Sequence, residues 1–157
     1  MTRRELREHV FLMLFRRDFY NDIEELKSQA ELYLEDSPTY LDDLNDIEKE
    51  DGYFKNSFIS MDDKEKEYLM NKVSAIFEKA DLLDEKINKV AKGWKTRRMS
   101  KVDLTIIRLA LYEMLYDEDV PEKVAINEGV ELAKKFGGDD SPSFVNGILA
   151  KLINREE

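Results

Sequence analysis

The sequence contains no cysteine and a single histidine, and both scarcities limit what the chain can do. Without cysteine there are no disulfide bonds and no cysteine-ligated metals, so we expect a cytoplasmic protein that needs no cofactor. His9 stands among arginines, and no serine or carboxylate pair has the spacing of a catalytic triad or a metal site. These absences disfavour an enzyme.

Long apolar segments are missing as well. No run approaches the roughly 18 apolar residues that span a bilayer, so we expect no membrane partner. Arginines followed by a short apolar stretch at the N-terminus superficially resemble a signal peptide. However, Arg16, Arg17 and Asp18 follow where a small-residue cleavage site should stand, so we do not expect a signal peptide.

Negative charge is abundant but local. The net charge of the 157 residues is −10, which at first sight disfavours a polyanion as partner. Residues 21–65 hold 15 Asp and Glu against four Lys, a net charge of −11, whereas the rest of the chain carries +1. Five bases and no acid fall within residues 92–101, which we call the basic hinge, and five arginines lie in the first 17 residues. Nucleic acid therefore remains a possible ligand at these two places.

Helical periodicity runs through the chain, and no segment alternates apolar and polar residues between turns as a strand does. The sequence predicts an all-α fold, a compact single-domain bundle of about seven helices over residues 1–157. Residues 101–116 are apolar on nearly every side, which predicts a central helix buried among several neighbours. The expected helices cover about residues 3–20, 23–36, 40–47, 60–80, 83–91, 101–116, 121–136 and 141–152.

Capping signals support these boundaries, because serine and aspartate satisfy free N–H groups at helix starts and glycine stops a helix. The signals are Ser60 with Asp63, Ser100 with Asp103, Pro121, the pair Gly137-Gly138, and Ser141-Pro142.

Several ordered motifs point to one family. They read SKVD at residues 100–103, IRLALYE at 107–113, VP at 120–121, VAINE at 124–128, AKKFG at 133–137 and FVNG at 144–147. With the arginine-rich start at residues 3–8, these motifs resemble the NusB family of transcription antitermination factors, and only residues 21–75 match weakly. The resemblance implies a compact helical domain that binds the boxA element of nascent ribosomal RNA jointly with the ribosomal protein NusE. Such a domain helps RNA polymerase to read through terminators.

The expected RNA-binding residues combine the basic hinge, whose cations can replace counterions on phosphates, with positions that the resemblance implies. These residues are Arg3, Arg4, Arg7, Phe15, Lys95, Arg97, Arg98, Lys101, Arg108, Asp140 and Phe144. Two departures from the family pattern lower the expected affinity for RNA. Ser141-Pro142-Ser143 lacks the His-Lys pair usual after the serine, and residues 21–65 are unusually acidic.

Several of these positions have a competing structural interpretation. The basic hinge also fits a solvated loop, and Arg108 fits an ion pair slightly better than an RNA contact. Asp140 could equally cap the last helix or accept hydrogen bonds from RNA. Phe144 could pack partly in the core and partly present its ring to a base. Within the hinge, Trp94 fits core packing better than stacking on a base, because it extends an apolar spacing at positions 83, 87, 90 and 91.

The expected partner surface lies beside the central helix and the acidic residues 21–65, because ribosomal proteins are basic. Its candidates are Asp103, which is chiefly a helix cap, and Tyr112, Glu113 and Tyr116. The proposed partners are thus single-stranded boxA-like RNA, NusE and the transcription elongation complex. Two rivals remain open: a helical protein-binding adaptor without RNA binding, and a homodimer whose RNA face is masked. NusB-like domains also occur fused to ribosomal RNA methyltransferases, but 157 residues leave no room for a catalytic domain.

Overall fold

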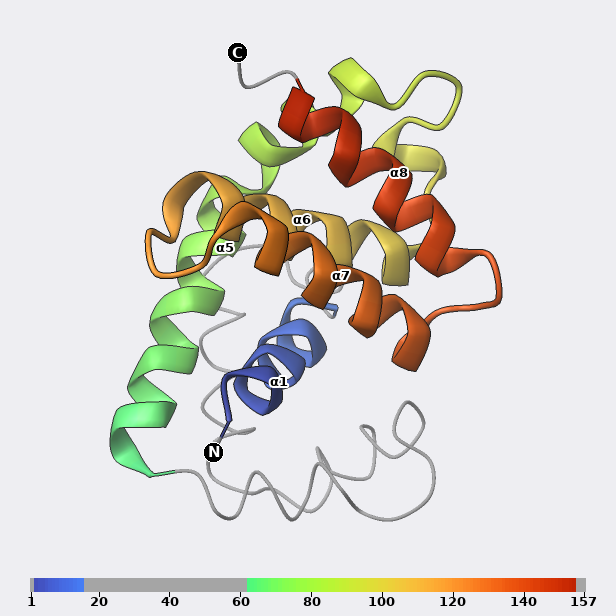
Figure 1. Cartoon of the computed structure of the whole chain (residues 1–157). Helices are drawn as coiled ribbons and strands as arrows, with labels where there is room; N and C mark the ends of the chain where they lie inside the picture. The colour runs from blue at the N-terminus through green and yellow to red at the C-terminus, as the bar shows by residue number, and fades with distance from the viewer. Residues whose placement is uncertain (1, 16–61, 155–157) are drawn as a thin grey trace. The chain divides into compact units, whose positions relative to one another are not determined.

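A computed structural model of the chain describes residues 2–15 and 62–154 (Figure 1). All regular structure in these residues is helical, which confirms the all-α class. The predicted helices at 23–36 and 40–47 lie outside the described residues. The described elements are α1 (Arg3–Phe15), α5 (Asp63–Val90), the short 3-10 helix η2 (Thr96–Arg98), α6 (Lys101–Tyr116), α7 (Glu122–Phe136) and α8 (Ser141–Asn154).

The chain divides into two compact units, Met1–Phe77 and Glu78–Glu157, and α5 runs through both of them. In the first unit, the hydroxyl of Thr2 accepts a hydrogen bond from the backbone N–H of Glu5 at 3.1 Å, so α1 begins at Arg3 as predicted. The side chains from Val10 to Leu14 are buried. That these units form a single domain over residues 1–157 stays a prediction.

Helix α5 begins with a reciprocal capping box two residues later than expected. The carboxylate of Asp62 accepts from the backbone N–H of Glu65 at 2.8 Å, and the carboxylate of Glu65 accepts from the N–H of Asp62 at 3.0 Å. The longer Glu65 side chain reaches back to the cap residue here, whereas the predicted pair of Ser60 with Asp63 stays a prediction. Ser60 itself lies outside the described residues.

The predicted break in this region, between residues 80 and 83, is wrong. Helix α5 continues for 28 residues to Val90. Neither proline nor glycine interrupts it, and Ala80, Leu83 and Ile87 are buried at helical spacing. One long apolar seam thus replaces the two shorter helices that we expected.

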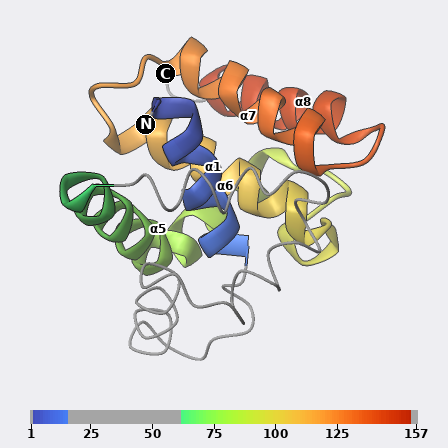
Figure 2. The same ribbon diagram turned by 90° about the horizontal axis from the view of Figure 1, so that it is seen from below.

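Helix α6 is the central helix of the second unit. Its bounds match the prediction, and the hydroxyl of Ser100 caps it by accepting from the N–H of Asp103 at 3.1 Å. Residues 104–111 are all buried, because α6 packs against both α7 and α8, which also pack against each other (Figure 2). Gly129 of α7 permits this close packing. A Cβ there would lie 3.2 Å from Leu149 of α8 and 3.4 Å from Ala110 of α6.

The turn between α7 and α8 is also closely packed. Helix α7 ends at Phe136 and Gly137 caps it as predicted, and a Cβ at Gly137 would lie 2.5 Å from the side chain of Ser141. Ser141 is the first residue of α8, and its hydroxyl accepts a hydrogen bond from the N–H of Gly138 at 3.1 Å. Ser141 therefore holds the preceding turn rather than capping α8 as expected. Pro121 stands one residue before α7 rather than inside its first turn.

Candidate nucleic-acid interface

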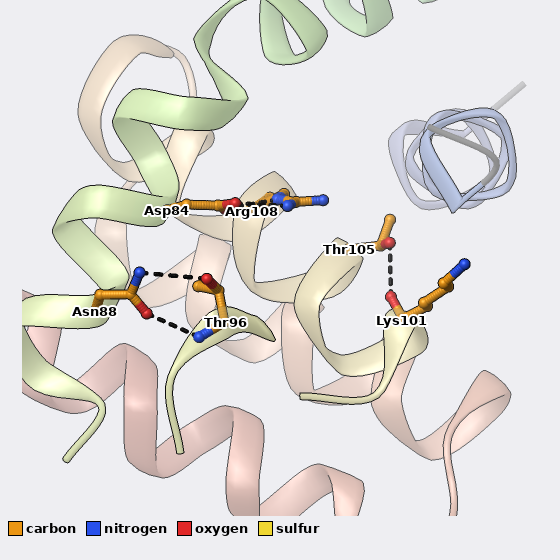
Figure 3. Close-up of polar contacts among 6 residues, drawn as sticks. All are labelled: Asp84, Asn88, Thr96, Lys101, Thr105 and Arg108. Atoms are coloured by element: carbon orange, nitrogen blue, oxygen red, sulfur yellow. Dashed lines mark hydrogen bonds and ion pairs between the residues drawn. The ribbon is translucent and has the colours of Figure 1, made fainter. Parts of the chain in front are cut away.

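The basic hinge joins α5 to α6, and the side chain of Asn88 on α5 holds it through two hydrogen bonds (Figure 3). The amide oxygen of Asn88 accepts from the backbone N–H of Thr96 at 2.7 Å, and its amide nitrogen donates to the Thr96 hydroxyl at 3.2 Å. The ammonium of Lys95 donates to the backbone oxygen of Asn88 at 2.8 Å. Gly93, with φ of +82°, turns the chain out of α5. The hinge therefore has a defined backbone shape.

The hinge presents its cations to solvent. The exposed bases are Lys92, Lys95, Arg97, Arg98 and Lys101. Within residues 2–15 and 62–154, no carboxylate pairs with Lys92, Arg97 or Arg98. Unpaired cations on a fixed loop suit the binding of phosphates, although a solvated loop would show the same exposure.

Trp94 is exposed, so the prediction that it packs in the core is wrong. Its side chain is 54% exposed, and the guanidinium carbon of Arg98 lies 5.2 Å from the ring centroid. The apolar spacing that suggested burial requires a continuous helix, but α5 ends at Val90 and Gly93 redirects the backbone. The indole is thus separated from the α5 seam.

Arg108 forms the ion pair that the sequence favoured. Its Nε and a terminal nitrogen donate to the two carboxylate oxygens of Asp84, at 2.7 and 2.6 Å. The two side chains are 8% and 20% exposed, respectively. The pair fastens α6 to α5 within the second unit (Figure 3). Sequence analysis missed both Asp84 and Asn88, because their partners lie 24 and 8 residues further along the chain and no local pattern marks them.

The arginine-rich start belongs to the first unit. Arg3 and Arg4 are exposed, whereas Arg7 is only 7% exposed and has polar contacts of its own. Arg7 is therefore not the freely exposed charge that its sequence position suggests. Phe15 is half-buried, and its ring stacks against Phe11 with centroids 5.9 Å apart.

The remaining RNA candidates lie together at the start of α8. The backbone oxygen of Asp140 accepts from the N–H of Phe144 at 3.1 Å. The carboxylate of Asp140 is exposed and accepts no hydrogen bond from the residues that the structure describes, so it does not act as a side-chain cap. Phe144 is half-buried, which agrees with a ring shared between core and surface.

The partner candidates divide into exposed and buried residues. Tyr112 and Tyr116 lie with ring centroids 5.3 Å apart, and Lys79 of α5 sits 4.6 Å from the centroid of Tyr116, which is 40% exposed. Glu113 is fully buried, so its expected place at the exposed edge is wrong. Asp103 is half-buried, and its Oδ1 has no hydrogen-bond partner in the described part of the chain.

The described residues were also searched for metal ligands and membrane spans. No group of three or more His, Cys, Asp or Glu side chains within them has an arrangement that could hold a metal ion. None of the described helices is long and apolar enough to cross a membrane.

Related proteins identify the family. The NusB family profile matches residues 4–154. The transcription antitermination protein NusB of Agathobacter rectalis is 48% identical over 151 residues, which cover 96% of this chain and 98% of the relative. That of Lachnoclostridium phytofermentans is 44% identical over 154 residues, covering 98% and 100%. A structure of T. maritima NusB superimposes with a TM-score of 0.72 at 29% identity, covering 99% of this chain and 92% of that one. The chain therefore belongs to the NusB family of transcription antitermination proteins.

Proposed function

We propose that this chain binds boxA-like single-stranded RNA jointly with the ribosomal protein NusE, as a non-catalytic factor of the cytoplasmic transcription elongation complex. The observation that carries the proposal is the basic hinge, which holds several unpaired cations on a backbone fixed by Asn88. Its chemistry is recognition, since RNA offers a row of phosphates that such cations can neutralise.

The acidic net charge does not oppose this proposal. At physiological ionic strength, exposed charges farther apart than about 8 Å are largely screened from each other. A phosphate that touches Arg97 or Arg98 lies beside the other hinge cations, which act on it at short range. The excess negative charge lies elsewhere in the sequence, in residues 21–65.

Different residues serve affinity and selectivity in this proposal. The hinge cations and the exposed Arg3 and Arg4 contact phosphates, which are the same in every RNA sequence. The carboxylate of Asp140 and the ring of Phe144 can address the edges and faces of unstacked bases. Arg108 supports the site through Asp84 and is not needed as a contact in this scheme.

The salt dependence of RNA binding tests the proposal. If four to six phosphates are neutralised, log affinity should fall against log salt with a slope of roughly −3 to −4, at about 0.7 for each contact. Replacing Lys95, Arg97, Arg98 and Lys101 with glutamine should flatten this slope and weaken all sequences alike. An unchanged slope in a variant with wild-type circular dichroism would show that the hinge is only a solvated loop.

For NusE, the proposal uses the exposed Tyr116, its neighbour Tyr112, and Asp103. A basic partner could supply the hydrogen bond that the buried Oδ1 of Asp103 lacks in the described residues. Tyr116→Ala and Asp103→Asn should weaken association with NusE while the isolated protein still binds RNA. If NusE binds normally and no RNA binds at all, the adaptor without RNA binding is the correct function.

A further inference from the structure

Trp94 is the most exposed of the large hydrophobic side chains in residues 2–15 and 62–154. At 54% exposure, it exceeds Tyr68 and Leu82, which are each 44% exposed. Contact with water is unfavourable for an apolar ring, so an exposed indole beside unpaired cations suggests a ligand that covers it. The identity of that ligand must come from the groups around the ring.

Those groups are cationic. The guanidinium of Arg98 lies over the ring, 5.2 Å from its centroid, and can cover only one of its two faces. Lys92 and Arg97 are exposed within three residues of Trp94, and neither pairs with a carboxylate of the described chain. An apolar protein partner would leave these charges uncompensated, whereas a nucleic acid offers a flat base for the ring and phosphates for the cations.

The ring is also carried on an ordered backbone. The N–H of Trp94 donates to the backbone oxygen of Ala91 at 3.3 Å, and the N–H of Arg98 donates to that of Lys95 at 2.8 Å. Asn88 fixes the intervening Thr96 through both ends of its amide group. Binding would therefore order little new structure, which reduces its entropic cost.

We propose that the open face of Trp94 is a stacking platform for one unpaired base of single-stranded RNA, with Arg98, Arg97 and Lys92 contacting the adjoining phosphates. This inference rests on the proposed function and adds the aromatic side chain of the basic hinge to its cations. Since every base has a flat face, the platform tolerates any base but requires that it be unpaired. Duplex RNA does not occupy it.

Trp94 is the single tryptophan of the chain, so its fluorescence reports on this site alone. Titration with a short uridine-rich RNA should quench the emission, and the quenching midpoint should match the dissociation constant measured by fluorescence anisotropy of labelled RNA. An RNA of equal length that lacks bases should bind through its phosphates but quench little. Duplex RNA should likewise leave the emission nearly unchanged.

Substitution gives an independent measurement. Trp94→Ala should weaken binding of the uridine-rich RNA by about 5- to 150-fold, the range expected for one stacked base, and Trp94→Phe should restore most of the loss. Binding of the base-free RNA should be the same for Trp94→Ala and the wild type. Tyr68→Ala, which removes an exposed ring from another element, is the matched control and should have no effect.

The platform and the proposed function fail in different ways. If the wild type binds RNA with the expected salt dependence, yet emission and Trp94→Ala affinity stay unchanged, the platform is wrong and the RNA function stands. If Trp94→Ala weakens binding of uridine-rich and base-free RNA equally, the platform is also wrong. Such a result would mean that the substitution changes the shape of the hinge and not a contact to a base. If the wild type binds no RNA, both proposals are wrong. If Trp94→Ala impairs only association with a protein, the platform alone is wrong.

Discussion

The ion pair between Arg108 and Asp84 should stabilise the fold strongly enough to measure by a double-mutant cycle. Two charge-assisted hydrogen bonds of 2.7 and 2.6 Å join the side chains. Each is worth roughly 1.5–3 kcal/mol, and removing one partner also leaves the other desolvated. Because Asp84 is 20% exposed, water can rehydrate part of its carboxylate. We therefore expect Arg108→Met to lower the free energy of unfolding by about 3 kcal/mol, near the lower end of the range for two such hydrogen bonds.

Urea unfolding followed by circular dichroism measures this cost. With a slope of about 2 kcal/mol per molar urea, Arg108→Met should lower the midpoint by about 1.5 M. The double variant Asp84→Leu/Arg108→Met should lose less unfolding free energy than the two single variants lose in total. The difference, the coupling energy, should be about 2 kcal/mol. The matched control is Lys134 with Glu131 on α7, 3.5 Å apart and 59% and 45% exposed, whose coupling should stay below about 0.5 kcal/mol.

The same variants separate the two interpretations of Arg108. If Arg108 is structural, Arg108→Met should bind RNA within about twofold of the wild type under conditions where it is fully folded. A coupling energy no larger than that of the exposed control pair would refute the structural reasoning. A large loss of RNA affinity with little loss of stability would make Arg108 a direct RNA contact instead.

Three further substitutions test the closely packed turn, the hinge anchor and base selectivity. Gly137→Ala should destabilise the protein by about 1–3 kcal/mol in urea unfolding, because the new Cβ would lie 2.5 Å from the side chain of Ser141; a neutral result would mean that the turn adapts freely. Asn88→Ala removes both side-chain bonds to Thr96, so thermal unfolding should show a cost of about 1–3 kcal/mol and RNA binding should weaken. RNA affinity equal to the wild type would show that hinge shape is irrelevant. Phe144→Ala should weaken boxA-like RNA more than a scrambled sequence in anisotropy titrations, and equal weakening of both would exclude a role for its ring in selectivity.

Local sequence signals predicted α6, α7 and α8 well. Ser100 marks the start of α6 because a hydroxyl cap depends on residues only three positions apart. Gly137 marks the end of α7 for an equally local reason, the absence of a side chain. Such features can be predicted because the interacting groups are close in the chain.

The errors occurred where distant residues or a change of backbone direction decide the outcome. Extending helical spacing from Val90 to Trp94 ignored that Gly93 could turn the chain, and so placed an exposed indole in the core. Glu113 looked like a surface residue by its charge, but packing around α6 buries it. The charge of Arg108 in an apolar helix suggested that it has an acidic partner. Because that partner, Asp84, lies 24 residues away, only the fold identifies it.

The two polar clamps on α5 also limit how this protein can change its length. Asp84 holds α6 and Asn88 holds the basic hinge, and four residues, about one helical turn, separate them on one side of α5 (Figure 3). Inserting or deleting one residue between them would rotate one clamp by about 100° relative to the other. Such a change would release either α6 or the hinge. Related chains should therefore keep this spacing fixed. A hinge moved into another protein should keep its shape only if the transferred segment extends from Asp84 to Arg108.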